Sequence, residues 1–317
     1  MLIAQWNILN RASDGWEAKG AVLADALVRR GVDAACLQEV PADGLDALAA
    51  AFAERGLTLA AGRLRQGRTD LCAVCWRTGA LEPVGGPSGV PGVDCAIQAF
   101  DGLAVCSYHG AWGAFRQRER LDEARLLDAR LSHCAAKGAV LLCGDFNAMP
   151  DEPAIRLLSG LSEAPTFWTE AQDTAAMLGR GGPYPTVLPG TSAEAAVTAR
   201  SQGLDPRLVP GRRIDYMFSY GWNYGRPGGW TGGVSAEDAG PSDHALLTAE
   251  TLDRDAWRTS ATKRRGGWFC PFFDPRPPAA AGMGGPPARQ WRRVGGPPLI
   301  SRRQDRNGRR PSGASAR

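Results

Sequence analysis

An apolar run that stops at a glycine and two polar residues places the strongest constraint on this chain. Residues 141–147 read Leu-Leu-Cys-Gly-Asp-Phe-Asn. Short apolar runs bounded by turn residues are typical of buried strands. We therefore expect a buried strand here, with the side chains of Asp145 and Asn147 presented at its carboxyl end.

Other polar clusters follow apolar runs in the same way. They are Trp6-Asn7, Gln38-Glu39, Tyr108-His109, and Arg213-Ile214-Asp215 with Ser242-Asp243-His244. Each cluster alone has an ordinary explanation, such as a turn after a strand or a surface ion pair worth about 0–1 kcal/mol. Their joint occurrence, each at an expected strand end, favours one shared site.

The first 55 residues alternate between strand and helix patterns. Apolar runs at 2–6 and 32–37 predict strands, and helical periodicity predicts helices over 16–30 and 44–55, the second capped by Asp43. Residues 57–108 hold short strand-like runs instead, including 70–76. There, Asp101-Gly102 predicts a hairpin that joins strands at 95–100 and 103–108.

The next part of the chain begins with a clear helix and becomes less regular. An amphipathic helix is expected over 117–137, leading into the strand at 139–143, and a short helix capped by Asp151 follows. Residues 164–211 are rich in Gly, Pro, Thr and Ala, which predicts long loops on one rim. Two late strands are expected at 213–218 and 245–250.

Charge is distributed unevenly along the chain. The first 250 residues hold 22 Lys/Arg and 29 Asp/Glu, whereas residues 251–317 hold 15 and 4. Because Gly, Pro and Arg dominate 256–317 without a helix or strand period, we expect one folded domain at 1–255 and a disordered basic tail at 256–317. A solvated extension is the favoured explanation of the tail, and contact with a polyanion is the alternative.

Cysteine usage favours a reducing compartment. The chain has eight cysteines, and Cys36, Cys106 and Cys143 lie inside apolar runs without a secretory segment before them, which predicts buried thiols in a cytoplasmic protein. Cys72 and Cys75 have the spacing of a zinc or redox pair, but no second pair or nearby histidine accompanies them, so a role in the core is favoured. No uncharged apolar stretch is long enough to predict a membrane span.

The polar clusters combine an asparagine, several carboxylates and two histidines. Carboxylate and amide oxygens are hard ligands that suit Mg²⁺ or Mn²⁺, whereas zinc prefers thiolates and imidazoles. The histidines then remain available for a proton or for phosphoryl oxygens. Because the sequence shows no Gly-x-Ser-x-Gly elbow, phosphoester hydrolysis fits these residues better than acyl transfer.

Four motifs together resemble the endonuclease/exonuclease/phosphatase superfamily, whose members have the DNase-I-like fold. The motifs are Gly144-Asp145-Phe146-Asn147, Trp6-Asn7, Leu37-Gln38-Glu39-Val40 and Ser242-Asp243-His244. The resemblance covers about residues 1–250. It implies an α/β fold in four layers (α/β/β/α), in which two mixed β-sheets pack face to face with helices outside. It also implies cleavage of phosphoester bonds with a divalent cation, Mg²⁺ or Mn²⁺.

The resemblance assigns the metal and water sides of the site. Glu39 matches the principal metal ligand, Asn7 its neighbour at the metal, and Asp243 a further ligand. Asp145 matches the group that orients or deprotonates the attacking water. Asn147 matches the residue that holds the phosphate or that water.

The resemblance also assigns the histidines. His244 matches the essential histidine beside the scissile phosphate, and Asp215 matches the carboxylate that fixes its tautomer. His109 matches the second histidine, which donates to a phosphoryl oxygen. Whether Asp145 or His244 is the general base stays open, and His133, on the expected helix, is interpreted as structural.

The segment after His109 adds candidates for substrate contact. Trp112, Phe115, Arg116 and Arg118 fall near the expected rim of the site. Aromatic rings stack on bases and arginines contact phosphates in single-strand recognition, so these four are candidate substrate-binding residues. The alternative is that both aromatics belong to the core and both arginines are solvated.

The sequence therefore predicts a Mg²⁺-dependent phosphodiesterase that acts on DNA or RNA. A phosphomonoesterase or a lipid or inositol-phosphate phosphoesterase is the first alternative, and no clear hydrophobic rim loop favours a lipid. A non-catalytic nucleic-acid-binding module is the second alternative, although none of the matched positions is missing. The sequence leaves open endo versus exo action and the oligomeric state.

Overall fold

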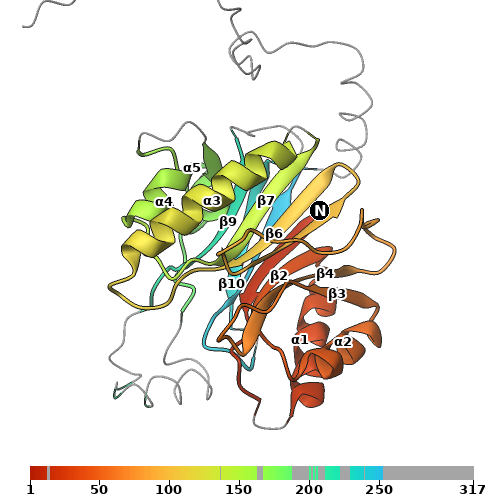
Figure 1. Cartoon of the computed structure of the whole chain (residues 1–317). Helices are drawn as coiled ribbons and strands as arrows, with labels where there is room; N and C mark the ends of the chain where they lie inside the picture. The colour runs from red at the N-terminus through yellow and green to blue at the C-terminus, as the bar shows by residue number, and fades with distance from the viewer. Residues whose placement is uncertain are drawn as a thin grey trace, which may run out of the picture. The chain divides into compact units, whose positions relative to one another are not determined.

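Short apolar runs form the strands of two β-sheets in the computed structural model of this chain (Figure 1). The structure describes residues 1–12, 15–135, 137–162, 167–187, 200, 203, 205, 211–221, 229–238 and 240–252. All of these residues lie in one compact unit, Met1–Trp268. The predicted tail at 256–317 lies outside the described residues, as do 164–166 and most of 188–210 within the loop predicted at 164–211.

The first sheet has its only parallel pair, among the described strands, in the middle. β1 and β2 run parallel there, and every other neighbour pair in this sheet is antiparallel. In spatial order the strands are β10 (Trp230–Glu237), β11 (Leu246–Thr251), β1 (Leu2–Asn7), β2 (Ala34–Pro41), β4 (Asp70–Arg77) and β3 (Leu57–Ala61).

The second sheet repeats this plan with fewer strands. β6 and β7 run parallel in its middle, and its other described pairs are antiparallel. In spatial order the strands are β5 (Cys95–Phe100), β6 (Leu103–His109), β7 (Ala139–Asp145), β9 (Asp215–Tyr220) and β8 (Trp168–Glu170). The hairpin predicted at Asp101-Gly102 is confirmed as the β5–β6 connection.

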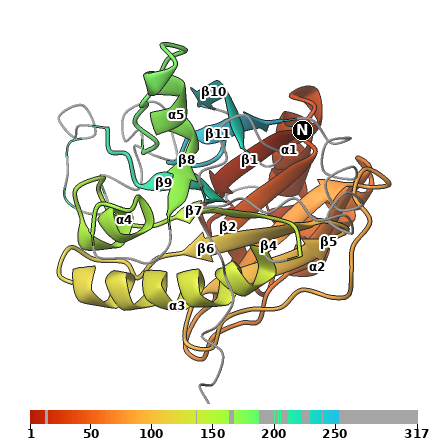
Figure 2. The same cartoon turned by 90° about the horizontal axis from the view of Figure 1, so that it is seen from above.

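Helices cover the outer face of each sheet (Figure 2). α1 (Trp16–Arg29) and α2 (Leu45–Ala53) share an apolar cluster with the first sheet, while α3 (Gln117–Ala135) and α4 (Pro153–Leu158) share one with the second. A short fifth helix, α5 (Ala171–Met177), follows β8 directly. The layers therefore run helix, sheet, sheet, helix, which confirms the predicted sandwich.

A third apolar cluster lies between the sheets. Ile3, Cys36 and Val74 of the first sheet meet Val105 and Leu141 of the second in this cluster. Because side chains alternate across a strand, every second residue of a central strand points into this layer and the others face the helices. This alternation explains why the central strands read as continuous apolar runs.

Several predicted boundaries and caps were wrong. β2 was expected to end before Gln38-Glu39, but it continues to Pro41 through an irregularity between Leu37 and Val40. Helix α2 begins after Gly44 without a side-chain cap from Asp43, and α4 is preceded by Glu152 rather than by Asp151. These errors arise because neither a strand bulge nor a helix start without a side-chain cap changes the periodicity of apolar residues, which is the signal that the sequence offers.

Three strands and one helix were not assigned from the sequence. β3 and β10 lie at edges of the first sheet, and β8 and α5 lie inside the segment predicted as loop. β8 has only three residues, so no alternation develops within it. Its position is fixed by tertiary contacts instead, since Trp168 is buried and pairs with Tyr220 of β9.

Cysteines in the described part of the chain are unpaired thiols. Six are buried and Cys134 is partly buried. Cys72 and Cys75 lie in the core on β4, as predicted, and burial raises the pKa of Cys75 to about 12. The same burial that protects these thiols makes them poor nucleophiles and poor metal ligands.

The described helices were also compared with the length and apolarity that a membrane span requires. None of them is both long and apolar enough to cross a bilayer.

Candidate active site

The sheet topology brings the predicted site residues to one edge of the second sheet. β6 and β7 run parallel and end at His109 and Asp145, while the antiparallel β9 begins at Asp215. The register places His109 opposite Asp145 and Asp145 opposite Asp215, so the three form one row. In the first sheet, β1 ends at Asn7, which pairs with Gln38 of β2.

Two glycines allow the backbone to pack tightly around this row. A Cβ atom at Gly144 would lie 2.1 Å from the carbonyl oxygen of Tyr108, and one at Gly110 would lie 2.3 Å from that of Phe146. Both distances are shorter than any van der Waals contact, so only glycine fits. The glycine that precedes Asp145 is therefore required by the neighbouring strand.

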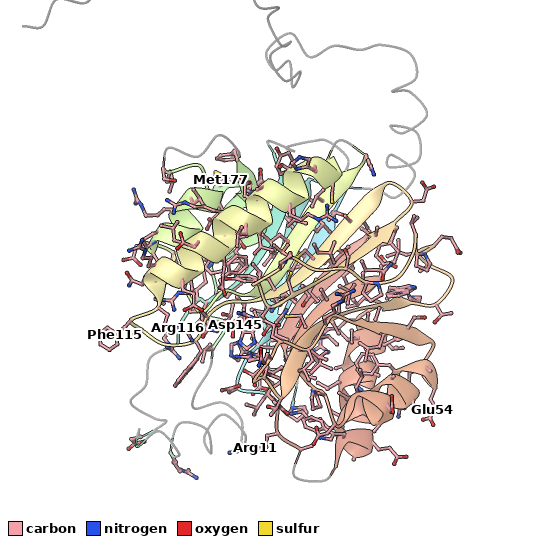
Figure 3. The ribbon with its side chains drawn as sticks, in the orientation of Figure 1. Arg11, Glu54, Phe115, Arg116, Asp145 and Met177 are labelled. Carbon is pink, nitrogen blue, oxygen red and sulfur yellow. The ribbon has the colours of Figure 1, made fainter. Side chains whose placement is uncertain are left out.

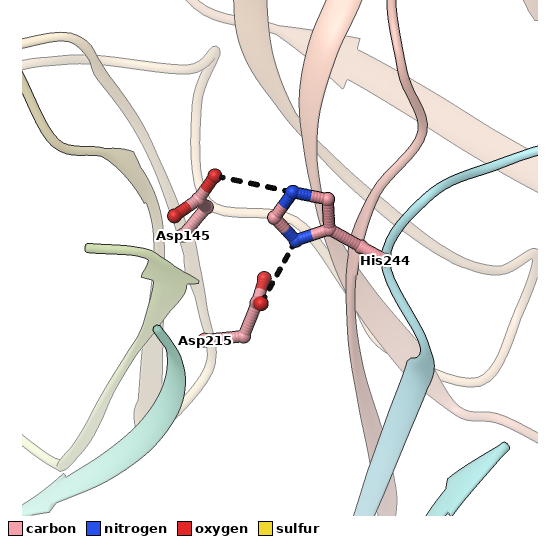
Figure 4. Close-up of side chains that lie close together, drawn as sticks. All are labelled: Asp145, Asp215 and His244. Atoms are coloured by element: carbon pink, nitrogen blue, oxygen red, sulfur yellow. Dashed lines mark hydrogen bonds and ion pairs between the residues drawn. The ribbon is translucent and has the colours of Figure 1, made fainter. Parts of the chain in front are cut away.

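His244 lies between two carboxylates (Figure 4). Its Nδ1 is 2.9 Å from Asp215 Oδ2, and its Nε2 is 3.7 Å from Asp145 Oδ2. Burial alone lowers the pKa of His244, but the charges of Asp215 and Asp145 outweigh burial and raise that pKa to about 10. Asp215 thus holds the ring with Nδ1–H toward itself and Nε2 toward Asp145.

The carboxylate of Asp215 is itself fixed on several sides. It is fully buried, its Oδ1 accepts a hydrogen bond from Gln5 Nε2 at 3.2 Å, and its backbone N–H donates to Thr186 Oγ1 at 3.1 Å. A buried carboxylate with these partners has one orientation available. His244 is therefore held by a rigid group.

Asn7 joins the two sheets at the site. Its Nδ2 donates to Glu39 Oε1 at 2.9 Å and to Asp145 Oδ2 at 3.0 Å, while its Oδ1 accepts from the backbone N–H of Leu9. The second oxygen of Glu39 accepts from the backbone N–H of Asn10 at 2.9 Å. The amide of Asn7 thus sets the spacing between two carboxylates from opposite sheets.

Glu39 and Asp243 form the acidic side of the site. Burial by itself raises the pKa of Glu39, but the imidazole of His109 and the hydrogen bonds from Asn10 and Asn7 outweigh it and lower that pKa. Burial raises the pKa of Asp243, and the nearby charge of Glu39 raises it further. Two carboxylates that repel each other beside an amide form a donor set that fits a hard divalent cation.

A second group of possible ligand atoms exists in the described residues. Asp145, Asp215 and His244 each offer one atom, and these atoms all lie within 4.8 Å of one another. The geometry admits a metal ion at this point as well. Nδ1 of His244 is already hydrogen-bonded to Asp215, so Nε2 is the ring nitrogen that remains for an ion at this point.

Backbone strain gathers at the same place. Within the described part of the chain, the non-glycine residues with positive φ are Leu9 (56°), Glu39 (57°) and Asn147 (49°). Two of them are predicted site residues, and the third donates to Asn7. Left-handed conformations of such residues cost of order 1–2 kcal/mol and cluster at functional sites. The strain marks this region independently of any sequence motif.

Asn147 and His109 complete the cluster around Asp145. The backbone N–H of Asn147 donates to Asp145 Oδ1 at 2.8 Å, and its side-chain Nδ2 donates to the carbonyl of Gly110 at 3.1 Å. Nε2 of His109 lies 3.8 Å from Asp145 Oδ2. All eight residues predicted for catalysis and metal binding therefore lie in one cluster, whereas His133 bonds its own helix at the carbonyl of Ala129.

Three contributors were missed by the sequence reasoning. Gln5 and Thr186 support Asp215, and Arg68 lies 3.2 Å from Nδ1 of His109. Gln5 left a usable signal, because a lone amide inside an apolar strand must find a buried partner. The sequence carries no comparable signal for Arg68, because it belongs to a loop and is separated from His109 by 41 positions.

The rim segment after His109 is held firmly in place. The fully buried Arg120 donates to the carbonyls of Ala111 and Gly113 and pairs with Glu152 at 2.7 Å. Glu123 accepts from the backbone N–H of Ala111 and from the hydroxyl of Tyr108. These buried contacts give the segment a fixed path on the protein surface.

The aromatic side chains of this rim point outward. Trp112 is 68% exposed and Phe115 is 102% exposed, so the alternative that they belong to the core is wrong. Figure 3 shows Phe115 projecting at the margin of the described domain, with Asp145 further inside. Arg116 and Arg118 are also exposed, and Arg116 pairs with Glu119, so the segment that follows His109 presents two rings and two guanidinium groups at the surface.

Comparison with known proteins defines the class of this protein. The model of the Endonuclease/Exonuclease/phosphatase family matches residues 4–244, so this chain belongs to that family. It is therefore a hydrolase that cleaves phosphoester bonds with a divalent metal. No curated protein sequence matches the chain.

Solved structures resemble the fold at low sequence identity. A complex of D. rerio TDP2 with a single-strand DNA product is 16% identical, with a TM-score of 0.56 over 78% of this chain and 97% of that one. The human nocturnin catalytic domain with bound sulfate is 17% identical, with a TM-score of 0.56 over 78% of this chain and 93% of that one. A mannosyl-6-phosphatase from Bacteroides thetaiotaomicron is 16% identical, with a TM-score of 0.55 over 80% of this chain and 100% of that one. At these identities the comparison shows a shared fold.

Proposed function

We propose that this protein is a Mg²⁺-dependent phosphodiesterase that hydrolyses nucleic acid. The observation that carries the proposal is the set of exposed rings and arginines on the segment that continues directly from His109 of the cluster. Bases stack on aromatic side chains and phosphates meet arginines in single-strand recognition. One of the structures with a similar fold, D. rerio TDP2, was solved with a single-strand DNA product.

Glu39, Asp243 and Asn7 are the residues that we assign to the metal. The two carboxylates supply charge, and Asn7 fixes one of them through its amide nitrogen. Mg²⁺ is favoured because these ligands are oxygens and their number is small, which leaves positions for water and substrate; Mn²⁺ has the same preferences. When bound, such an ion neutralises phosphate charge and lowers the barrier to displacement at phosphorus.

The remaining cluster residues handle water and the phosphate. Asp145, held by Asn7 and by the backbone of Asn147, lies 3.7 Å from Nε2 of His244, so a water to one side of this pair reaches both groups. Because its raised pKa keeps His244 protonated at neutral pH, the proton of that water passes to the carboxylate of Asp145. His109 donates from Nε2 to a phosphoryl oxygen, and Asn147 holds the phosphate or the water.

A surface hollow extends the rim beside α3. It has a volume of about 470 Å³, and its lining combines Phe115, Arg116 and Arg118 with three acids, Glu119, Asp122 and the buried Glu123. We propose that Trp112 and Phe115 stack on bases and that Arg116 and Arg118 contact the backbone phosphates of the same strand. A single strand fits this role better than a duplex, since the rings must reach base faces.

A phosphomonoesterase is the second candidate. The fold similarity to the mannosyl-6-phosphatase favours it, and so does the excess of acidic residues in the first 250 positions, which disfavours tight polyanion binding. A small phosphate ester would use the same metal and histidine groups without the rim. The two candidates therefore differ in whether the rim contributes to turnover.

A substrate panel decides between these candidates. Single-stranded and duplex DNA, RNA, inositol phosphates, sphingomyelin and a sugar phosphate are incubated with Mg²⁺, Mn²⁺ or EDTA. We expect hydrolysis of single strands that requires the metal and disappears in Glu39→Ala, Asp145→Ala and His244→Ala variants that remain folded. Turnover of the sugar phosphate alone would support the phosphomonoesterase, and undiminished turnover in the three variants would overturn the assignment of the site.

The basic tail and the location are proposed on separate grounds. Residues 256–317 hold an excess of Arg over acidic residues, so we propose that they tether polyanions. Truncation after Asp255 should weaken nucleic-acid affinity and reduce its salt dependence; unchanged affinity would exclude the tether. A reducing, cytoplasmic location is proposed because the described cysteines are free and buried.

A further inference from the structure

The two histidines of the site have opposite kinds of partner at Nδ1. Nδ1 of His244 faces a carboxylate, Asp215, at 2.9 Å. Nδ1 of His109 faces a guanidinium, with Arg68 Nη2 at 3.2 Å. A carboxylate can only accept a hydrogen bond here, and a guanidinium can only donate one. The two rings are therefore held in different hydrogen-bonding states.

Arg68 is itself fixed by two buried carboxylates. Its Nη2 donates to Asp70 Oδ2 at 3.1 Å, and its Nε lies 3.0 Å from Asp70 Oδ1 as an ion pair without a hydrogen bond. Asp94 Oδ2 lies 3.3 Å from the same Nη2. Both acids are at least nine-tenths buried. Since the first Nη2 hydrogen is used by Asp70, the second points toward His109, with Asp94 alongside.

The backbone holds His109 in place against this guanidinium. The His109 N–H donates to the carbonyl of Asp94 at 2.9 Å, and the ring is buried. Charged groups around the ring come from four elements: Arg68 and Asp70 from the segment that enters β4, Asp94 from the segment before β5, Asp145 from β7, and Glu39 from β2. Of these, Arg68 is the one hydrogen-bonded to a ring nitrogen among the described residues.

We propose that Arg68 is a positioning residue that fixes His109 as the neutral tautomer protonated at Nε2, directed toward Asp145. A proton on Nδ1 would place two donors 3.2 Å apart, so Nδ1 must carry its lone pair. The Nε2–H then points to the position where a phosphoryl oxygen would accept it. His109 acts as a fixed donor, whereas His244, held by Asp215, keeps its proton on Nδ1.

This proposal deepens the proposed function, because the use of the Nε2–H rests on a phosphate in the site. The tautomer itself does not rest on it. It is set by contacts within the chain and can be measured without substrate, metal or turnover. The tautomer and the proposed function can therefore fail separately.

Nitrogen NMR of the full chain labelled with ¹⁵N-histidine tests the tautomer. The chain has three histidines, so a His133→Asn and a His244→Asn variant assign the spectrum. We expect His109 to show an unprotonated Nδ1 and a protonated Nε2 in the wild type. A protonated Nδ1 would overturn the proposal whatever the enzyme hydrolyses.

Substitution of Arg68 then tests the cause. In Arg68→Met we expect a mixed or reversed tautomer at His109, and in Arg68→Lys a partial return, because an ammonium can also donate to Nδ1. Arg65→Met is the matched control: Arg65 belongs to the same loop with similar side-chain exposure, 38% against 35%, but pairs with Glu123. An unchanged His109 signal in Arg68→Met would refute the assigned role. If that variant does not fold, the wild-type and Arg68→Lys spectra decide.

A double-mutant cycle shows whether Arg68 acts through His109. We expect Arg68→Met to lower kcat about 10- to 100-fold with a smaller change in KM, by analogy with partners that orient metal-bound histidines. In a His109→Ala background the same substitution should have no further effect on kcat. An equal loss in both backgrounds would mean that Arg68 only supports the fold, and would contradict the proposal.

Discussion

Nδ1 of His244 lies 2.9 Å from Oδ2 of Asp215, although the two residues belong to segments of different sheets. His244 precedes β11 of the first sheet, and Asp215 begins β9 of the second. Asn7 and Asp145 make a second bond between the sheets at 3.0 Å. The geometry for catalysis is therefore completed only when the sheets pack.

Asp215→Asn should disable the enzyme without unfolding it. The amide keeps the volume of the carboxylate but can present an N–H to Nδ1 of His244, which reverses the hydrogen bond and lets the ring change tautomer. We expect kcat to fall about 10²- to 10⁴-fold, as for other carboxylates that orient a catalytic histidine. Initial rates and the thermal midpoint measure the two effects. A wild-type kcat in this variant would show that His244 needs no fixed tautomer.

Asn7→Ala should weaken metal binding. The variant loses the amide that fixes Glu39 Oε1 beside Asp145, so Glu39 gains freedom and the acidic pair is less ordered. We expect a 10- to 100-fold rise in the Mg²⁺ concentration needed for half-maximal activity, checked by calorimetric titration of the same protein.

Asn10→Ala is the control for that experiment. Asn10 supports Glu39 through its backbone N–H, while its side chain makes only an exposed contact with Thr69 at 3.4 Å. The metal requirement should stay at the wild-type value. An equal shift in both variants would indicate a general loss of order in this loop rather than a specific role for the Asn7 amide.

Gly144→Ala should destabilise the fold and displace Asp145. The added methyl would lie 2.1 Å from the carbonyl oxygen of Tyr108, so β6 and β7 must separate. We expect a loss of about 2–4 kcal/mol in the free energy of unfolding, in the range of overpacked core substitutions. Denaturant unfolding measures it. Gly86→Ala, where a Cβ meets no atom within 4 Å, should change stability by less than about 0.5 kcal/mol.

Glu170 should make stability fall as pH rises. Its carboxylate accepts a hydrogen bond from the backbone N–H of Met217 in β9, the strand that begins at Asp215. It also forms an ion pair with Arg213, which pairs with Asp173 as well. Burial raises the pKa of Glu170 from 4.5 to about 7, against the attraction of Arg213. Below pH 4.5 the Glu170 carboxyl is protonated in both the folded and the unfolded protein. As pH rises toward 7, the unfolded state releases its proton first, so folding stability is lost, by about 3 kcal/mol at most.

Glu170→Gln isolates this effect from the other acids. The amide carries no titrating proton, so the free energy of unfolding of the variant should be flatter between pH 4.5 and pH 7 than that of the wild type. Urea unfolding at several pH values gives both curves. Parallel curves would exclude Glu170 as the source of the pH dependence.

Phe115→Ala and Trp112→Ala should impair turnover of a single strand but not of a small phosphodiester. A base that stacks on an aromatic ring contributes about 1–3 kcal/mol, so we expect a rise in KM for an oligonucleotide of about fivefold or more. A chromogenic small diester reaches the metal and histidines without touching the rim and serves as the internal control. Equal losses on both substrates would show that the rings support the site itself.

Much of the site was predictable because its residues stand where apolar runs stop. Asn7, His109 and Asp145 end strands whose side chains alternate between two apolar layers, and the layers fix where those ends meet. The position of Glu39 was less predictable, since β2 continues past it through a bulge. A bulge depends on how the partner strand pairs, and no local period records that pairing.

The hydrogen bonds that support the site residues could not be predicted from the sequence, for a different reason. Arg68 touches His109 across 41 positions, and Thr186 meets Asp215 across 29. Each belongs to a loop whose path is set by the folded sheets. Hydrogen bonds of this kind are consequences of tertiary packing, so only the assembled structure reveals them.

The left-handed conformations at Leu9, Glu39 and Asn147 imply a trade-off between the stability of the fold and its activity. Glycine adopts this conformation at no steric cost, and each of the three positions carries a larger residue at a cost of order 1–2 kcal/mol. A lineage selected only for heat resistance would tend to accumulate glycine there and lose the side chains of Glu39 and Asn147 from the cluster. The persistence of such residues in descendants of this chain would record continued selection for catalysis.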